Sequence, residues 1–277
     1  MAKNKFISHE KQFEMLKNSY HNNFPNSWIF YGIKGIGKSF VAKEFIKWII
    51  FNDTFLNNSE FFNFSDENKS KILNNLFIAC CHHLNFDSDE PSNIDNVRDL
   101  IKKINYTNFS EINKNFILID NFENLNLNSV NALLKTLEEP PKGTIIIIIT
   151  HSINLIPRTL TSRCVKLKFN SLNEDCFHQV LKLKDIFLDK KIEKILFNLT
   201  YGSPGFFLNI HSKDGFELIS LIEDTIEEKR INYIKIRKIS EILSKNKYFF
   251  LNLFKSILYQ KTKEILLENY KDIKLYN

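Results

Sequence analysis

The sequence predicts an α/β fold, in which a domain built on a parallel β-sheet covers residues 1–170 and helices form the rest of the chain. Three observations support this prediction. Short apolar runs alternate with helix-like segments through the first 170 residues, as in βαβ units. Two of these runs, 116–119 and 145–149, are apolar throughout, which is typical of strands covered on both faces. Strand signals then stop at about residue 171.

The first elements follow from the spacing of apolar residues. Residues 28–31 form a short strand that leads into a glycine-rich loop. Residues 39–51 form a helix whose apolar face consists of Val41, Phe45, Ile46, Ile49 and Ile50. Residues 52–70 are rich in Asn, Ser and Phe and are expected to be irregular. A strand is expected at 84–86, after which helical spacing returns at Ile94, Val97, Leu100, Ile101 and Ile104.

The later elements complete the sheet and begin the helical part. Residues 128–141 contain an amphipathic helix that ends at two prolines. Residues 165–169 form a strand near the sheet edge, because two lysines interrupt its apolar residues. Residues 176–186 and 190–199 have helical spacing. A final apolar stripe is expected either at an interface or in the domain's own core, and it consists of Phe250, Leu253, Phe254, Ile257 and Leu258.

Composition is that of an ordinary globular protein, with 43% hydrophobic and 25% charged residues among 277, enough for about two domains. No apolar run approaches the ~20 residues of a membrane helix, and the first residues do not resemble a secretory signal. Four cysteines without spaced pairs fit a reducing compartment, so we expect a cytoplasmic protein with no membrane contact. Residues 229–277 hold twelve Lys or Arg and four Asp or Glu, which indicates either a nucleic-acid or acidic partner, or a solvated helical face.

Residues 32–39 read Gly-Ile-Lys-Gly-Ile-Gly-Lys-Ser, a complete phosphate-binding loop between an expected strand and helix. Backbone N–H groups of such a loop surround nucleotide phosphates. Lys38 is expected to contact the β- and γ-phosphates, and Ser39 to ligate Mg²⁺. The predicted cofactor is therefore ATP or ADP with Mg²⁺. The candidate binding residues of the loop are Gly32, Gly35, Ile36, Gly37, Lys38, Ser39 and Phe40.

Asp120 ends the apolar strand 116–119, where a second Mg²⁺-linked carboxylate is expected. The next residue is Asn121, whose amide cannot accept a proton from water, and loss of a general base typically costs about 10²–10⁴ in rate. Glu123 is the alternative base, or else a solvated acid near a helix start. The sequence therefore predicts a protein that holds a nucleotide and hydrolyses it poorly.

Four motifs, in this order, resemble those of bacterial DNA polymerase III clamp-loader subunits, which are AAA+ proteins. They are Gly-Ile-Gly-Lys-Ser at 35–39, Asn-Ala-Leu-Leu-Lys-Thr-Leu-Glu-Glu-Pro-Pro at 131–141, Ser-Arg-Cys at 162–164 and Gly-Ser-Pro-Gly at 202–205. The resemblance covers residues 1 to about 210. It implies an AAA+ nucleotide-binding domain over 1–170, a helical lid over 171–207 and a helical oligomerisation collar over 208–277.

The resemblance also implies roles for single residues. Arg163 would act as an arginine finger that reaches ATP on a neighbouring subunit, whereas without the motif it would be read as a surface ion-pair residue. Thr150 would sense the phosphate state, or else is a strand-end threonine. Asn121, and the Phe206-Phe207 pair where ATP-active relatives carry a phosphate-sensing arginine, favour the delta prime type over the gamma/tau motor.

Two cysteine-containing segments suggest chemistry that we do not expect. Cys80-Cys81-His82-His83 offers four possible zinc ligands, but adjacent residues cannot readily converge on one tetrahedral ion. No zinc is therefore expected, and the segment is read as the flank of a buried strand. Cys164 follows Arg163 and is expected to be a small buried residue rather than a nucleophile.

The function that follows from the resemblance is that of a stator. It would join the gamma/tau and delta subunits and help the complex load the sliding clamp onto primed DNA in the bacterial cytoplasm. Two rivals stay open from sequence alone: an active ATPase motor similar to gamma/tau, and a nucleotide-binding switch outside replication.

Overall fold

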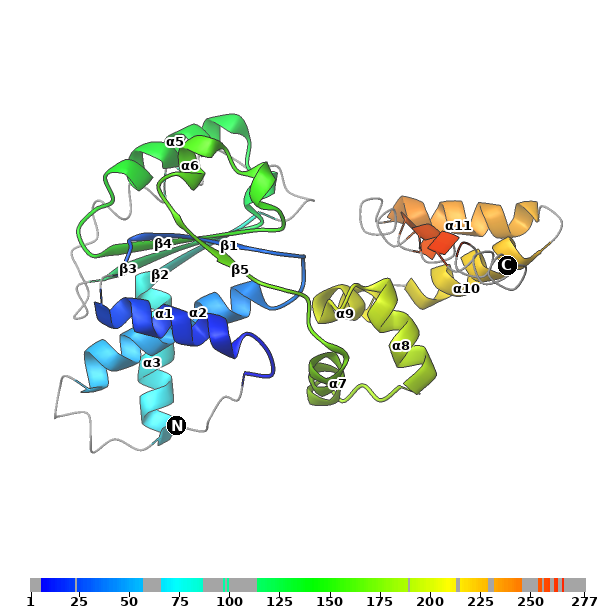
Figure 1. Ribbon diagram of the computed structural model, residues 1–277, viewed down its shortest axis with the longest axis horizontal. Helices are drawn as coiled ribbons and strands as arrows, with labels where there is room; N and C mark the ends of the chain where they lie inside the picture. Colours follow the sequence, from blue (N-terminus) through cyan, green and yellow to red (C-terminus); the bar gives the residue numbers. More distant parts are fainter. Residues whose placement is uncertain are drawn as a thin grey trace, which may run out of the picture. The chain divides into compact units, whose positions relative to one another are not determined.

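Figure 1 shows a computed structural model of the protein, which describes residues 6–22, 24–56, 66–86, 97, 99, 114–188, 190–212, 215–228, 232–245 and single positions between 254 and 266. The chain divides into two compact units, Met1–Asn170 and Ser171–Asn277. Among the described residues, no helix combines the length and the apolar character that crossing a membrane requires.

The first unit is built on a five-stranded sheet with the order β2-β3-β4-β1-β5, in which every neighbouring pair is parallel. The strands are β1 (Ser27–Tyr31), β2 (Cys81–Asn85), β3 (Asn115–Asp120), β4 (Thr144–Thr150) and β5 (Val165–Lys168). All seven residues of the central β4 are buried, whereas β5 lies at the edge and buries only Leu167. The predicted α/β class and the edge position of β5 are confirmed.

Helices cover both faces of this sheet, as parallel strands require. On one face lie α1 (Glu10–Asn22), α2 (Lys38–Phe51) and α3 (Asp66–Cys80), and on the other lie α5 (Leu127–Glu138) and α6 (Arg158–Thr161) (Figure 1). The predicted apolar face of α2 is buried throughout. Asn126 caps α5 by accepting a hydrogen bond from the backbone N–H of Ser129 at 2.8 Å.

Two expectations for residues 52–86 were wrong in part. Residues 52–56 form a π-helical turn and residues 66–70 begin α3, although residues 57–65 lie outside the described part of the chain. The acidic pair Asp66 and Glu67 suits a helix start, a signal that the many Asn and Ser residues obscured. Strand β2 begins at Cys81, three residues before the predicted start, because His82 and His83 pair with β3. Of the helical pattern expected near residue 100, only Val97 and Asp99 are described, and both are helical.

The second unit is helical, with α7 (Glu174–Leu183), α8 (Lys190–Leu199), α9 (Pro204–Ser212), α10 (Gly215–Glu227) and α11 (Tyr233–Lys245). One cluster of buried residues extends from Phe177 in α7 to Ile257. Phe254 packs against this cluster, so these two members of the predicted stripe belong to the unit's own core. Phe250 and Leu253 lie outside the described residues. The division into a lid and a collar near residue 207 stays a prediction.

Candidate nucleotide-binding site

The phosphate-binding loop joins β1 to α2 and depends on glycine at two positions. Gly32 has a φ of 147°, and a Cβ atom there would meet the carbonyl oxygen of Phe169 at 2.2 Å. Gly37 has a φ of 99° and forms the N-terminal cap of α2. Both backbones lie where L side chains are strained. The loop therefore brings backbone N–H groups and the positive end of α2 to one place, which fits a phosphate group.

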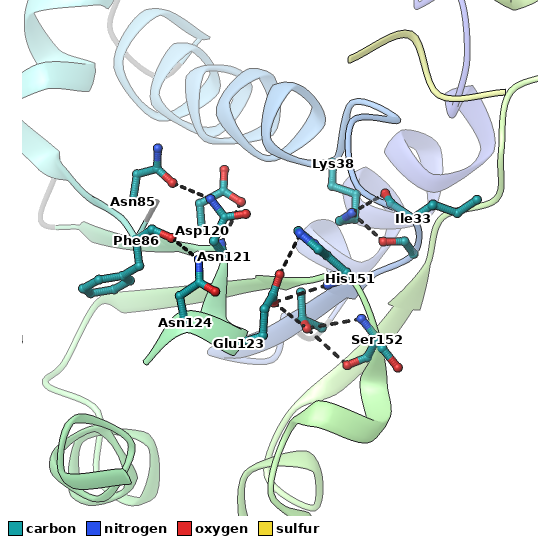
Figure 2. A network of polar contacts seen from close by, with 12 residues as sticks. Ile33, Lys38, Asn85, Phe86, Asp120, Asn121, Glu123, Asn124, His151 and Ser152 are labelled. Carbon is teal, nitrogen blue, oxygen red and sulfur yellow. Dashed lines mark hydrogen bonds and ion pairs between the residues drawn. The ribbon is translucent and has the colours of Figure 1, made fainter. Parts of the chain in front are cut away.

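Lys38 lies inside the loop, with 4% of its surface exposed. Its Nζ donates to the carbonyl oxygens of Gly32 and Ile33, each at 2.6 Å (Figure 2). Burial lowers the pKa of Lys38 to about 8, although Asp120 and Glu123 raise it and Lys34 lowers it further. A bound phosphate would offer this ammonium a charged acceptor in place of carbonyl dipoles, and charge-assisted hydrogen bonds are the stronger kind.

Asp120 ends β3, and Asn121 follows it in the left-handed conformation, with φ 53° and ψ 48°. Asparagine is among the few residues that adopt this conformation readily. The backbone N–H of Asn121 donates to Asp120 Oδ1 at 3.0 Å, and its Nδ2 donates to Asn85 Oδ1 at 2.8 Å. Only 7% of Asn121 is exposed. The residue in the place of a general base is thus a buried amide bound to the end of β2 (Figure 2).

Glu123 lies in a 3₁₀ turn, Phe122–Asn124, and contacts the end of β4. Thr150 Oγ1 donates to Glu123 Oε2 at 2.9 Å, and His151 Nε2 lies 2.8 Å from Glu123 Oε1 (Figure 2). Burial raises the pKa of Glu123. The hydrogen bond from His151 and the charge of His151 lower this pKa, and smaller contributions that include Thr150 lower it further, so the net pKa lies below the ordinary value. The carboxylate is therefore ionised at neutral pH. The sequence named Glu123 and Thr150 as candidates, but it gave no sign that they touch or that His151 joins them.

His9 is a second residue that the sequence reasoning did not assign to the loop. Its Nε2 lies 2.8 Å from the carbonyl oxygen of Ile36, which can only accept, so this nitrogen carries the proton. Burial lowers the pKa of His9, the Ile36 contact raises it, and Lys38 lowers it. The signal that could have found it is the segment Ile-Ser-His-Glu at 7–10, which precedes the first strand and is also similar to the clamp-loader family. Phe40, in contrast, has 54% of its surface exposed and packs edge-on against Phe6.

The residues present fit a nucleotide with Mg²⁺. The described residues contain no group of three or more His, Cys, Asp or Glu side chains that could hold a metal ion. Mg²⁺ in phosphate sites uses only one or two carboxylates besides phosphate oxygens and water. Ser39, which is half-buried in the first turn of α2, and Asp120 would supply the protein ligands. The bound group would supply the charge that Lys38 neutralises.

The cysteine-containing segments have ordinary structural surroundings. Cys80 ends α3 and the next three residues begin β2, where alternation places His82 on the opposite face from Cys81 and His83. All four cysteines are free. Burial raises the pKa of the Cys164 thiol to about 11, against smaller opposing effects of Arg163 and Lys166. The thiol is therefore protonated and a poor nucleophile.

Arg163 follows α6, and its side chain contacts α5 and α6 rather than the phosphate-binding loop. Its Nη1 donates to the carbonyl oxygen of Thr159 at 2.6 Å, and its Nη2 lies 2.8 Å from Glu138 Oε1. The side chain is 38% exposed. Arg163 therefore does form a surface ion pair, as expected for this residue without the motif. This contact leaves a role toward a neighbouring subunit open, because that role depends on the remaining donors.

Phe207, after the Gly-Ser-Pro-Gly turn, is fully buried and packs against Phe177. Phe206 is partly buried against the same cluster. Neither side chain can bind a phosphate, so the two positions after this turn carry no cation.

The fold and the loop define a P-loop protein of the α/β class. The family model described as "DNA polymerase III, delta subunit" matches residues 8–173. The chain belongs to this family, which confirms the membership of the clamp-loader AAA+ proteins predicted from its motifs.

Known relatives carry DNA polymerase III names. The gamma subunit of Buchnera aphidicola subsp. Schizaphis graminum is 29% identical over 248 residues, covering 87% of this chain and 62% of the relative. The delta' subunit of Pseudomonas aeruginosa is 35% identical over 81 residues, covering 29% and 24%. The chain thus spans less than two thirds of either relative. A gamma subunit-related structure from Thermotoga maritima is 15% identical with a TM-score of 0.40, covering 90% of this chain and 98% of that structure. The fold assignment rests on the order of the strands in the sheet and not on this likeness.

Proposed function

We propose that the chain is a clamp-loader subunit of the delta prime type, a stator that holds ATP or ADP weakly or structurally and hydrolyses it poorly. The observation that carries this proposal is Asn121. Its side chain stands directly after Asp120, is buried, and donates to Asn85. An amide is too weak a base to take a proton from a water molecule. The intact loop and the buried Lys38 support retention of nucleotide binding.

The contribution of this subunit to catalysis is proposed to be Arg163. An arginine carries five N–H donors, and the contacts to Thr159 and Glu138 engage two of them. The others can meet the γ-phosphate of ATP on an adjacent gamma/tau subunit, where an arginine finger is worth about 10³–10⁵ in rate. The partners would be the gamma/tau and delta subunits, and through them the sliding clamp and primed DNA, in the bacterial cytoplasm.

Two measurements test this proposal. The isolated chain should bind labelled ATP and show negligible turnover in the same sample. In a complex reconstituted with gamma/tau and delta, Arg163→Ala should leave assembly intact and lower turnover at the adjacent site by about 10³-fold or more. Unchanged turnover would remove Arg163 from the mechanism, and failure to associate would overturn the clamp-loader role.

The gamma/tau motor is the second candidate, because the Buchnera gamma subunit aligns with 87% of the chain and the ionised Glu123 carboxylate lies close enough to Lys38 to raise its pKa. Turnover by the isolated chain that Lys38→Ala and Glu123→Gln both abolish would establish the motor and replace the stator. A switch outside replication is disfavoured by the family membership.

A further inference from the structure

We propose that Glu138 is a positioning residue for Arg163, which it holds ready for the phosphate of a neighbouring subunit. This inference rests on the proposed function, since it concerns the same arginine. It starts from one contact, the 2.8 Å ion pair between Arg163 Nη2 and Glu138 Oε1. The pair joins two of the motifs that are distant in sequence, Leu-Glu-Glu-Pro-Pro and Ser-Arg-Cys.

The guanidinium is fixed from two elements at once. Glu138 is the last residue of α5, and Thr159, whose carbonyl oxygen accepts from Nη1 at 2.6 Å, lies in α6. Two contacts on different nitrogens define the plane of the group, whereas one contact would leave it free to rotate. Within the part of the chain that the structure describes, the Nε–H and one N–H on each terminal nitrogen remain available for phosphate oxygens.

The backbone on both sides of the ion pair is anchored in one buried cluster. Leu137 precedes Glu138 and is 5% exposed, and Cys164 follows Arg163 and is 8% exposed. Leu160 of α6 is fully buried, and all three residues belong to the same cluster. The two motifs are therefore held at a fixed separation, and only the two side chains have to meet.

A held arginine favours catalysis because an arginine side chain has many rotamers. If the side chain is already held in one rotamer before the subunits dock, less conformational entropy is lost when the arginine binds the phosphate. Glu138 and Arg163 are both partly exposed, with 48% and 38% of their side chains accessible, so the effect of the pair is small. An exposed pair of this kind corresponds to about a two- to fivefold change in rate.

The neighbouring Glu139 provides a matched control. It has the same chemistry, is also exposed, and lies one position further along the same motif. Its backbone N–H donates to the carbonyl oxygen of Lys135, which glutamine would leave unchanged. Glu138→Gln removes the charge that faces Arg163, whereas Glu139→Gln removes an equal charge beside it.

The first test uses the isolated chain and requires no partner. Modification of Arg163 by phenylglyoxal, followed by mass spectrometry with Arg237 as internal reference, should be about two- to fivefold faster in Glu138→Gln. Glu139→Gln should react like the parent chain, and melting temperatures should show that both variants are folded. Equal reactivity of all three proteins would show that Glu138 does not hold Arg163 and would overturn the inference.

The second test measures ATP turnover of the reconstituted complex. Glu138→Gln should lower kcat about two- to fivefold with KM and assembly unchanged, and should have no further effect when Arg163 is already alanine. A decrease with Arg163→Ala but not with Glu138→Gln would overturn this inference alone and leave the proposed function standing. A higher kcat in Glu138→Gln would show that the carboxylate restrains the arginine, which also overturns it. If Arg163→Ala left turnover unchanged, both proposals would be overturned.

Discussion

At the scale of single residues, the backbone conformation and the neighbouring atoms determine which residues the phosphate-binding loop can accept at its glycine positions. Gly32 faces the carbonyl oxygen of Phe169, which immediately follows the edge strand β5, so the space for a side chain is filled by main chain that cannot rotate away. A Cβ atom added at Gly37 would meet no atom within 4 Å beyond its chain neighbours, and only the positive φ disfavours other residues. The two glycines are therefore required for different reasons.

Substitution of these glycines should separate a steric clash from backbone strain. Gly32→Ala should lower the free energy of unfolding by about 2–5 kcal/mol, because strain and overpacking both apply. Gly37→Ala should cost only about 1 kcal/mol, since its added methyl group meets no atom within 4 Å. Denaturant titration of both variants measures the difference, and equal losses would contradict the clash.

The lowered pKa of Lys38 predicts opposite effects of pH on nucleotide binding and on stability. Above about pH 8 the folded chain loses the ammonium charge, so the affinity for ATP should fall by up to tenfold for each pH unit. The unfolded chain, with the ordinary value of 10.5, holds this proton more tightly. Between these values the unfolded state binds more protons, and the Lys38 contribution to stability should rise with pH.

Titration of ATP binding from pH 7 to 10, together with denaturation over the same range, checks both directions. Lys38→Ala serves as the control and should show neither slope. An affinity for ATP that stays constant in the parent chain would mean that Lys38 carries an ordinary pKa.

At the scale of elements, asparagine amides fix the loop between β3 and α5. Asn121 donates to Asn85 at the end of β2, and Asn124 Nδ2 donates to the carbonyl oxygen of Phe86 at 2.6 Å. Asn126 then caps α5. These contacts determine where Glu123 lies at one end of α5, while the other end carries Glu138.

The cap of α5 gives a prediction with a control two residues away. Asn126→Ala should destabilise the protein by about 1 kcal/mol, because the N–H of Ser129 loses its acceptor. Asn128→Ala, at an exposed position inside the same helix, should be neutral or slightly stabilising because alanine favours helix. Thermal or denaturant unfolding of the pair tests the cap, and equal effects would argue against it.

At the scale of the whole molecule, the two units have separate buried clusters. One contains strands β1, β3 and β4 together with Leu133 and Leu160, and the other extends from Phe177 to Ile257. A residue central to one cluster should therefore affect mainly its own unit.

Phe207→Ala should lower the stability of the second unit by about 3–5 kcal/mol, since the side chain is fully buried between Phe177 and Phe216. Hydrogen exchange should show lost protection in Ser171–Asn277 and little change in Met1–Asn170. Ile148→Ala, in the central strand β4 and fully buried in the first cluster, should give the reverse pattern. Loss of protection throughout the chain in either variant would show that the units unfold together.

The sequence by itself determined the fold class, the phosphate-binding loop, Asp120 and the family motifs, because each depends on local spacing or on a short run of residues. Strand and helix limits in residues 52–86 were less well predicted, since Asn and Ser occur in turns and in helices alike, and since β2 is set by pairing with β3. The sequence places an amide, Asn121, where a base is expected, but it gave no sign of the left-handed backbone of this residue or of its bond to Asn85.

Tertiary structure alone decided which side chains meet. Glu123 and Thr150 are 27 positions apart in sequence, yet they are joined because parallel strands end at the same edge of the sheet. Glu138 and Arg163 meet because α5 and α6 bury their apolar residues in one cluster. Contacts of this kind depend on packing between elements, which periodicity within an element does not encode.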